Sequence, residues 1–187
     1  MRDVFLTFDD GPGPFCGSVL DALSQAGAPA MFFLCGREVD LRPALVQRIR
    51  AEGHALGNHT YLHPPLSFLA PSRAAEEIWR TNDAIHRACG ARPALFRPPY
   101  GDMPGHVRRK VEDLGMTHVS WDVDTGDASG ASVTDITDRA TSRAGPGSII
   151  LLHEMPNTIR ALPAIIRKLR EQGLQPAAPR RLETHGR

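Results

Sequence analysis

Residues 4–12, Val-Phe-Leu-Thr-Phe-Asp-Asp-Gly-Pro, decide the fold, because an apolar, aromatic-rich run ends on two adjacent carboxylates, Asp9 and Asp10. The run predicts a buried strand, and the Gly-Pro directly behind it predicts a turn. Charges at the end of a buried strand are unfavourable unless a cation, a proton or hydrogen bonds compensate them. Two readings follow: a functional site with one carboxylate on a metal ion and the other free, or a plain acidic turn.

Outward from this stretch, short apolar runs alternate with segments of helical periodicity. Strands are expected at 4–8, 30–34, 54–58, 95–97, 116–120 and 148–152, and helices at 18–26, 41–52, 72–89, 104–114, 133–143 and 158–172. This alternation predicts an α/β fold with parallel strands and right-handed crossovers. A complete eight-unit barrel needs about 250 residues. The 187 residues therefore predict an incomplete barrel of seven or fewer units.

Length and composition favour one domain over 1–187, with a Pro- and Arg-rich tail that frays from about Gln175. A net charge of +1 gives no indication of a nucleic-acid or membrane partner, and we expect a monomer. Three cysteines without metal or redox spacing indicate reduced thiols. With the first strand so close to Met1 there is no room for a signal peptide, so we expect a cytoplasmic protein, although a trimmed secreted precursor would look the same.

The unusual polar residues all follow the carboxyl ends of expected strands. Besides Asp9 and Asp10, these are His59, Arg97, the segment 122–127 and His153. In parallel α/β folds these strand ends form the rim where ligands bind. We therefore expect these residues to share one rim of the barrel.

His59 and His63 are spaced four residues apart, which would place both imidazoles on one face of a helical turn. With one carboxylate they would form a His2Asp site whose open positions are typical of a catalytic metal. Alternatively, the spacing arises by chance and the rings only make hydrogen bonds in a loop. The other histidines have no such partner and are expected to be ordinary surface or core residues: His54, His86, His106, His118 and His185.

A stiff segment, Arg97-Pro98-Pro99-Tyr100-Gly101, follows the strand at 95–97. Neither proline has an N–H, so the N–H of Tyr100 is the first backbone donor past the turn. Gly101 beside it would allow close approach of a substrate, which makes this N–H a candidate oxyanion donor. The alternative is a proline-rich loop with a surface arginine.

His153 ends the apolar strand at 148–152, a position where a histidine is often simply packed. A carboxylate from Asp122, Asp124 or Asp127 could fix its tautomer and raise its pKa, as a general acid requires. Glu154, directly behind it, could instead face solvent.

Taken together, five ordered stretches resemble the NodB-homology polysaccharide deacetylases, carbohydrate esterase family 4. They are Thr7-Phe8-Asp9-Asp10-Gly11-Pro12, His59-Thr60-x-x-His63, Arg97-Pro98-Pro99-Tyr100-Gly101, Trp121-Asp122-Val123-Asp124-x-x-Asp127 and Leu151-x-His153. The resemblance spans nearly the whole chain and implies a distorted (β/α)7 barrel. One departure is Ala128, which stands where the family usually has a tryptophan after the aspartate matching Asp127.

The resemblance also implies a role for each matched residue. Asp9 would be the general base, oriented by Arg97, and His153 the general acid, held by Asp127. One divalent ion, usually zinc or cobalt, would be bound by Asp10, His59 and His63. The N–H of Tyr100 would stabilise the oxyanion. Substrate-binding positions would be Leu151, in the acetyl pocket, with Trp121, Pro99 and Gly101.

The implied function is metal-dependent removal of an N-acetyl group from an acetylated aminosugar. N-acetylglucosamine oligomers or a related small intracellular compound are the expected substrates. Two alternatives are an acetylxylan-type O-acetyl esterase and a sugar-binding relative without catalysis.

Overall fold

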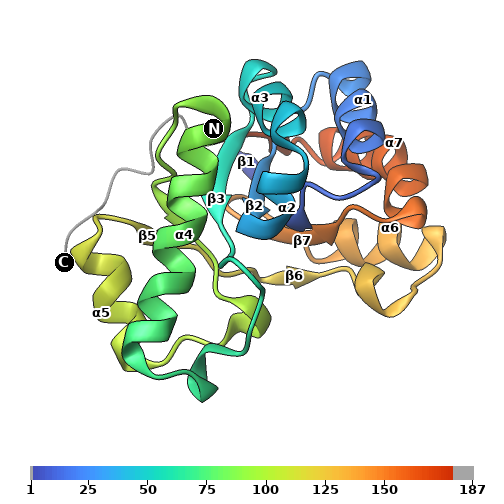
Figure 1. Cartoon of the computed structure of the whole chain (residues 1–187). Coiled ribbons are helices and arrows are strands. Elements are labelled where there is room, and N and C mark those ends of the chain that lie inside the picture. The colour runs from blue at the N-terminus through green and yellow to red at the C-terminus, as the bar shows by residue number, and fades with distance from the viewer. Residues whose placement is uncertain (1, 179–187) are drawn as a thin grey trace.

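The computed structural model describes residues 2–178 and consists of a curled parallel sheet with helices packed around it (Figure 1). Its strands lie in the order β5-β4-β3-β2-β1-β7-β6, and all neighbouring pairs are parallel. Their bounds are β1 (Asp3–Gly11), β2 (Met31–Leu34), β3 (Ala55–Asn58), β4 (Leu95–Phe96), β5 (Thr117–His118), β6 (Val123–Asp124) and β7 (Ile149–His153). The prediction of a distorted, incomplete (β/α)7 barrel with parallel strands is confirmed.

Helices follow the strands and cover the sheet: α1 (Cys16–Ala26), α2 (Gly36–Leu41), α3 (Pro43–Ala51), α4 (Pro71–Cys89), α5 (Gly105–Asp113), α6 (Val133–Ser142) and α7 (Pro156–Glu171). Short 3₁₀ turns are η1 (Leu66–Phe68), η2 (Pro99–Gly101) and η3 (Asp127–Ser129). The single helix expected at 41–52 is wrong at its start, because Pro43 opens α3 and a separate α2 precedes it. Within residues 2–178, every helix is too short or too polar to cross a bilayer.

Alternation along β1 separates the two faces of the sheet. Val4, Leu6 and Phe8 are fully buried and pack in a core that includes residues of α1, α3 and α7. Phe5 packs on the other face with Met31, Phe33, Leu95 and Val119, all from strands or their ends. Side chains two residues apart on a strand share a face, so Asp9 lies on the same face of the sheet as Phe5. Its carboxylate therefore points into the mouth of the barrel.

The end of the described chain returns to its beginning. Gln175 and Pro176, which the sequence analysis places at the start of a frayed tail, instead form β8 (Gln175–Pro176) beside Asp3 and Val4 of β1. The Gln175 N–H donates to the Arg2 carbonyl at 2.9 Å. The rest of the expected tail, residues 179–187, lies outside the described residues.

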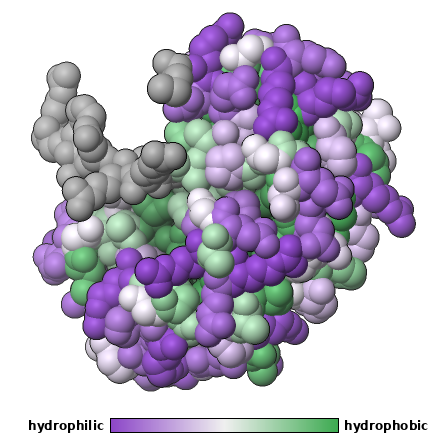
Figure 2. Space-filling view, turned by 90° about the horizontal axis from the view of Figure 1, so that it is seen from above, coloured by the Kyte–Doolittle hydropathy of each residue, from purple (hydrophilic) through white to green (hydrophobic). Residues whose placement is uncertain are grey.

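Figure 2 views the molecule from above and shows hydrophilic residues over most of the visible surface, with apolar residues between them. This distribution is expected of helices that turn their apolar faces to the sheet.

Candidate active site

Asp9 and Asp10 leave the same strand in different directions. Asp9 keeps the alternation of β1 and is 4% exposed. Asp10 has φ 69°, and the pairing of β1 with β2 is irregular between Phe8 and Gly11. This break in the pleat turns the Asp10 side chain, which is 52% exposed, toward the rim instead of the helix side. Two adjacent carboxylates thereby reach one site, as the sequence analysis expects.

Arg97 holds Asp9 from inside the barrel. Its side chain is fully buried, and Nη1 donates to Asp9 Oδ1 and Thr7 Oγ1, both at 2.8 Å. The rest of the guanidinium donates to the carbonyls of Val119 and Ser120. Burial lowers the pKa of Arg97, and the Asp9 carboxylate opposes that effect. The arginine is therefore a buried cation whose three nitrogens all donate hydrogen bonds and whose Nη1 fixes Asp9, and not the surface arginine of the alternative reading.

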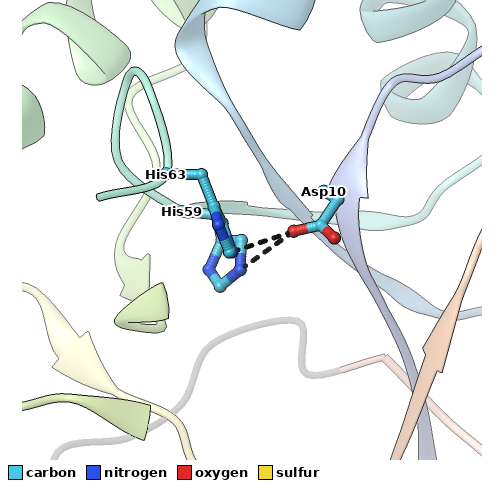
Figure 3. Close-up of side chains that lie close together, drawn as sticks. All are labelled: Asp10, His59 and His63. Carbon is cyan, nitrogen blue, oxygen red and sulfur yellow. Dashed lines mark ion pairs between the residues drawn. The ribbon is translucent and has the colours of Figure 1, made fainter. Parts of the chain in front are cut away.

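Figure 3 shows the Asp10 carboxylate directed at His59 and His63, with Asp10 on β1 and both histidines on the chain after β3. Asp10 Oδ1 lies 3.1 Å from His63 Nε2 and 3.4 Å from His59 Nε2. Burial acts to raise the pKa of Asp10, but the two imidazoles outweigh it and hold that pKa below its ordinary value. Within residues 2–178, these three side chains are the one group of three or more possible ligands with donors so close together.

The donor set fits a small divalent ion. Zinc bonds of about 2.0–2.1 Å in a tetrahedron separate the ligand atoms by roughly 3.3 Å, close to the two distances observed. His59 Nδ1 lies 2.7 Å from the Arg97 carbonyl, which can only accept a hydrogen bond, so Nδ1 carries the proton and Nε2 keeps a free lone pair. Asp10, His59 and His63 could therefore hold a metal ion together.

The prediction that the histidine pair lies on a helical turn is wrong. Residues 59–63 form an irregular bend in which Thr60 (φ 67°) and His63 (φ 60°) adopt the left-handed conformation. The two rings still come together, with centroids 4.9 Å apart. The spacing therefore predicts the proximity of the rings but not the backbone that produces it.

His153 lies beside Asp9 in the register of β1 and β7. Asp127 Oδ1 is 2.8 Å from His153 Nδ1, and Oδ2 accepts hydrogen bonds from the His153 N–H and the Thr158 hydroxyl. Burial alone would lower the pKa of His153, but the hydrogen bond and charge of Asp127 raise it above its ordinary value. The other two aspartates are engaged elsewhere: Asp122 with Ser148 and Ile149, and Asp124 with the Gly126 N–H.

Tyr100 lies at the edge of the site in the left-handed conformation (φ 59°), with its ring 4.7 Å from that of His63. A Cβ added to Gly101 would lie 3.3 Å from the Trp121 indole, which itself lies over Arg97. Pro99 is buried in η2. Leu151 is buried two residues before His153, on the same face of β7.

A cavity of about 490 Å³ opens beside the site, and Tyr100, Gly101 and Trp121 are not part of its lining. Asp9, Asp10, His63 and His153 line it, and it continues along side chains that are not among the expected site residues: Pro14, Phe15, Arg37, Tyr61, Leu62 and Met155. The four expected substrate-binding residues (Leu151, Trp121, Pro99 and Gly101) lie outside this lining. These residues form no local sequence pattern that would indicate such a role.

Two buried glutamates complete the surroundings. The prediction of a solvent-facing Glu154 is wrong, since Glu154 is only 8% exposed and burial raises its pKa. Glu77 on α4 is 9% exposed and is not among the expected site residues. A signal for it does exist, because Glu77 falls on the buried face of α4 with Ala74, Ile78 and Thr81.

Comparison with known proteins places this geometry in a family. Residues 1–119 match the polysaccharide deacetylase family. The chain belongs to that family. It is 37% identical over 177 residues to a peptidoglycan-N-acetylglucosamine deacetylase of Bacillus cereus, with 91% of this chain and 64% of the relative covered. It is also 37% identical to a chitooligosaccharide deacetylase of Bradyrhizobium, with 93% and 87% covered.

Among solved structures, a family 4 carbohydrate esterase from Streptomyces lividans in complex with acetate matches with a TM-score of 0.90 and 39% identity, over 95% of this chain and 97% of that one. This agrees with the expected membership of carbohydrate esterase family 4. The chain spans less than two thirds of the length of the Bacillus cereus relative. In this family member Ala128 is exposed, and its N–H donates to Asp127 Oδ1 at 2.8 Å.

Proposed function

We propose that this polysaccharide deacetylase family member removes N-acetyl groups from N-acetylglucosamine-containing oligosaccharides or related small aminosugars, with one divalent ion, zinc by preference and cobalt as an alternative. The observation that carries the proposal is the pairing of Asp9 with His153 across one rim, each fixed by a buried partner, Arg97 and Asp127. Base and acid therefore flank the candidate metal ligands.

In the proposed reaction, Asp9 takes a proton from the attacking water. Arg97 keeps Asp9 oriented toward the site, and Asp9 Oδ2 stays 3.6 Å from His59 Nε2. A carboxylate that binds a metal is a poor base, so two aspartates divide the tasks, with Asp10 as ligand. When bound by Asp10, His59 and His63, a divalent ion supplies Lewis-acid polarisation of the acetyl carbonyl.

His153 delivers a proton to the departing amine. Its Nδ1 is held by Asp127, so Nε2 is the atom that faces the site, 3.9 Å from Asp10 Oδ2. The raised pKa of His153 favours the protonated form that an acid needs. The N–H of Tyr100 would donate to the developing oxyanion. The acetyl methyl group would be enclosed by Leu151, below His153, and by Trp121, with Pro99 and Gly101 shaping the adjacent loop.

The relatives' names support an amide as the bond and an aminosugar as the carbohydrate. The decisive experiment measures acetate release from N-acetylglucosamine oligomers, a non-polymeric N-acetyl aminosugar and acetylated xylan, with chelator-treated and metal-reconstituted protein. Release from the N-acetyl compounds, lost on chelation and restored by zinc or cobalt, is the expected result. Release from xylan alone would favour the esterase, and binding without release would favour a non-catalytic relative.

A further inference from the structure

Two glutamates beside the site belong neither to the candidate ligands nor to the proton-transfer pairs. Glu77 comes from α4 and Glu154 follows β7 directly, and both are more than nine-tenths buried. A carboxylate so far from water is unfavourable unless it accepts hydrogen bonds. Their partners are backbone N–H groups of the two turns that carry Asp10, His59 and His63.

Glu77 holds the bend between the two histidines. Its Oε2 accepts hydrogen bonds from the N–H groups of Tyr61 (2.8 Å) and Leu62 (2.7 Å). The residues on either side of that pair, Thr60 and His63, are both left-handed, a conformation that a β-branched residue such as Thr60 rarely adopts. Such a backbone persists only where its surroundings fix it. Glu77 supplies two of the bonds that fix it.

Glu154 holds the turn that follows Asp10. Its Oε2 accepts a hydrogen bond from the Gly13 N–H at 2.5 Å. Its Oε1 lies so close to Gly11 that a Cβ added there would be 2.3 Å away. The carboxyl group therefore fills the inside of the turn after Asp10 (φ 69°), and a side chain at position 11 would displace it.

We propose that Glu77 and Glu154 are positioning residues of the metal site, each fixing the backbone turn that presents one side of the ligand set. The proposal rests on the proposed function, because it assumes that Asp10, His59 and His63 bind a metal ion. Glu77 sets the approach of the two imidazoles, and Glu154 sets the approach of the Asp10 carboxylate. Neither glutamate belongs to the candidate ligand set, although Glu154 also lines the cavity beside it.

The test for Glu77 is the affinity for zinc, measured by competition with a chromophoric chelator, so that deacetylase activity plays no part. Glu77→Met removes the acceptor and keeps a similar volume, and we expect it to weaken zinc binding at least about tenfold, as loss of such outer partners usually does. Glu77→Gln keeps an oxygen for the two N–H groups without the charge, and should bind about threefold more weakly. Glu76→Met is the matched control, since Glu76 is the neighbour on α4 and pairs with Arg73 at the surface.

Glu154→Met and Glu154→Gln are measured in the same way and should follow the same order. Thermal unfolding and amide exchange of Tyr61, Leu62 and Gly13 are recorded on the metal-free proteins. If exchange accelerates or the unfolding temperature falls while zinc affinity stays within twofold of wild type, the glutamates stabilise the fold alone and the proposal is overturned. Should a methionine variant not fold, the glutamine variant decides, and wild-type affinity in it overturns the proposal.

The wild-type protein separates this proposal from the proposed function. If wild type binds no zinc or cobalt, the metal-dependent function fails, and the positioning role fails with it. If wild type binds zinc but the variants bind it equally well, only the positioning role fails.

Discussion

Carboxylates meet imidazoles at two places on the rim, and the two arrangements differ in how closed they are. The Asp127 side chain is 1% exposed, and its two oxygens bond the His153 N–H, His153 Nδ1 and Thr158. The Asp10 side chain is 52% exposed and reaches His59 and His63 at 3.4 and 3.1 Å. The closed pair, Asp127 with His153, fixes the position of one proton. The open cluster, Asp10 with His59 and His63, leaves room for an ion between its donors.

The difference originates in the backbone. Asp127 lies in η3, with its carboxylate directed at Thr158 near the start of α7 and at the end of β7. Asp10 lies near the end of β1 in the left-handed conformation, where the pairing of β1 with β2 is irregular. The same two residue types therefore acquire different tasks from the elements that carry them. Four substitutions test this contrast.

The largest effect is expected from removing a donor of the open cluster. His59→Ala should lower bound metal and hydrolysis together, the rate by at least about a thousandfold, because Lewis-acid stabilisation is worth several kcal/mol. Elemental analysis and acetate release measure the two quantities. His86→Ala, an exposed histidine on α4, is the control and should change neither. Full activity in a metal-free His59→Ala protein would end the ligand assignment.

The second largest effect is expected from removing the carboxylate of Asp9, which is proposed to stay off the metal. Asp9→Asn should keep the metal and lose at least about a hundredfold in rate, the usual contribution of one positioned proton-transfer group. Metal content, thermal unfolding and kcat are compared with those of Asp138→Asn, a surface aspartate paired with Lys168. If Asp9→Asn instead loses the metal and keeps the fold, Asp9 and Asp10 exchange roles.

The closed pair is tested by the pH profile. The hydrogen bond and charge of Asp127 raise the pKa of His153, so the protonated acid persists to higher pH than in an ordinary histidine. Asp127→Asn removes that charge and lowers the pKa, so the alkaline limb of kcat should move to lower pH, with a rate loss of about tenfold at the optimum. Asp124→Asn is the control, since Asp124 bonds the Gly126 N–H and not His153. An unmoved alkaline limb in Asp127→Asn would mean that another group sets it.

The smallest effect is expected beside the closed pair. Ala128 is exposed where the family usually has an indole, so Ala128→Trp should narrow the site and exclude water. Aromatic contacts are worth about 0.5–1.5 kcal/mol, which predicts a change of a few fold in the ratio of kcat/KM between chitin oligosaccharides and a non-polymeric N-acetyl substrate. If both values and their ratio stay as in wild type, this wall does not select substrate.

The sequence predicts the strands that lie in apolar runs, including the short β4 and β5, and misses the short β6. The strands β1 and β7 are predicted from continuous apolar runs, whereas the two residues of β6 carry no usable periodicity. The helix expected at 41–52 is in fact divided, with α2 ending at Leu41 and α3 beginning at Pro43. Pro43 does indicate this division, because proline favours the first turn of a helix. The pairing of Gln175 with Asp3 joins residues that are far apart in the sequence, so no local pattern could predict it.

In the site, the sequence predicts which residues gather but not how each is held. Asp9, Arg97 and His153 are predicted to meet because all three follow strand ends. The burial of Glu154 depends on Gly13, 141 residues away in the chain, so neighbouring residues could not indicate it. The left-handed backbone of Thr60 and His63 likewise depends on hydrogen bonds that backbone N–H groups donate to the side chains of Asn58 and Glu77, whereas the i, i+4 spacing alone predicts a helix.

The place of β1 also has a consequence for synthesis. This strand is translated well before β7, yet the Thr7 hydroxyl donates to the carbonyl of Ile150, 143 residues later. At about 5–20 residues per second, one edge of β1 waits roughly 7–30 s for β7 on the ribosome. An unpaired apolar strand edge can recruit other chains. Chaperone demand should therefore concentrate on nascent chains that end before residue 149, and be relieved once β7 has emerged.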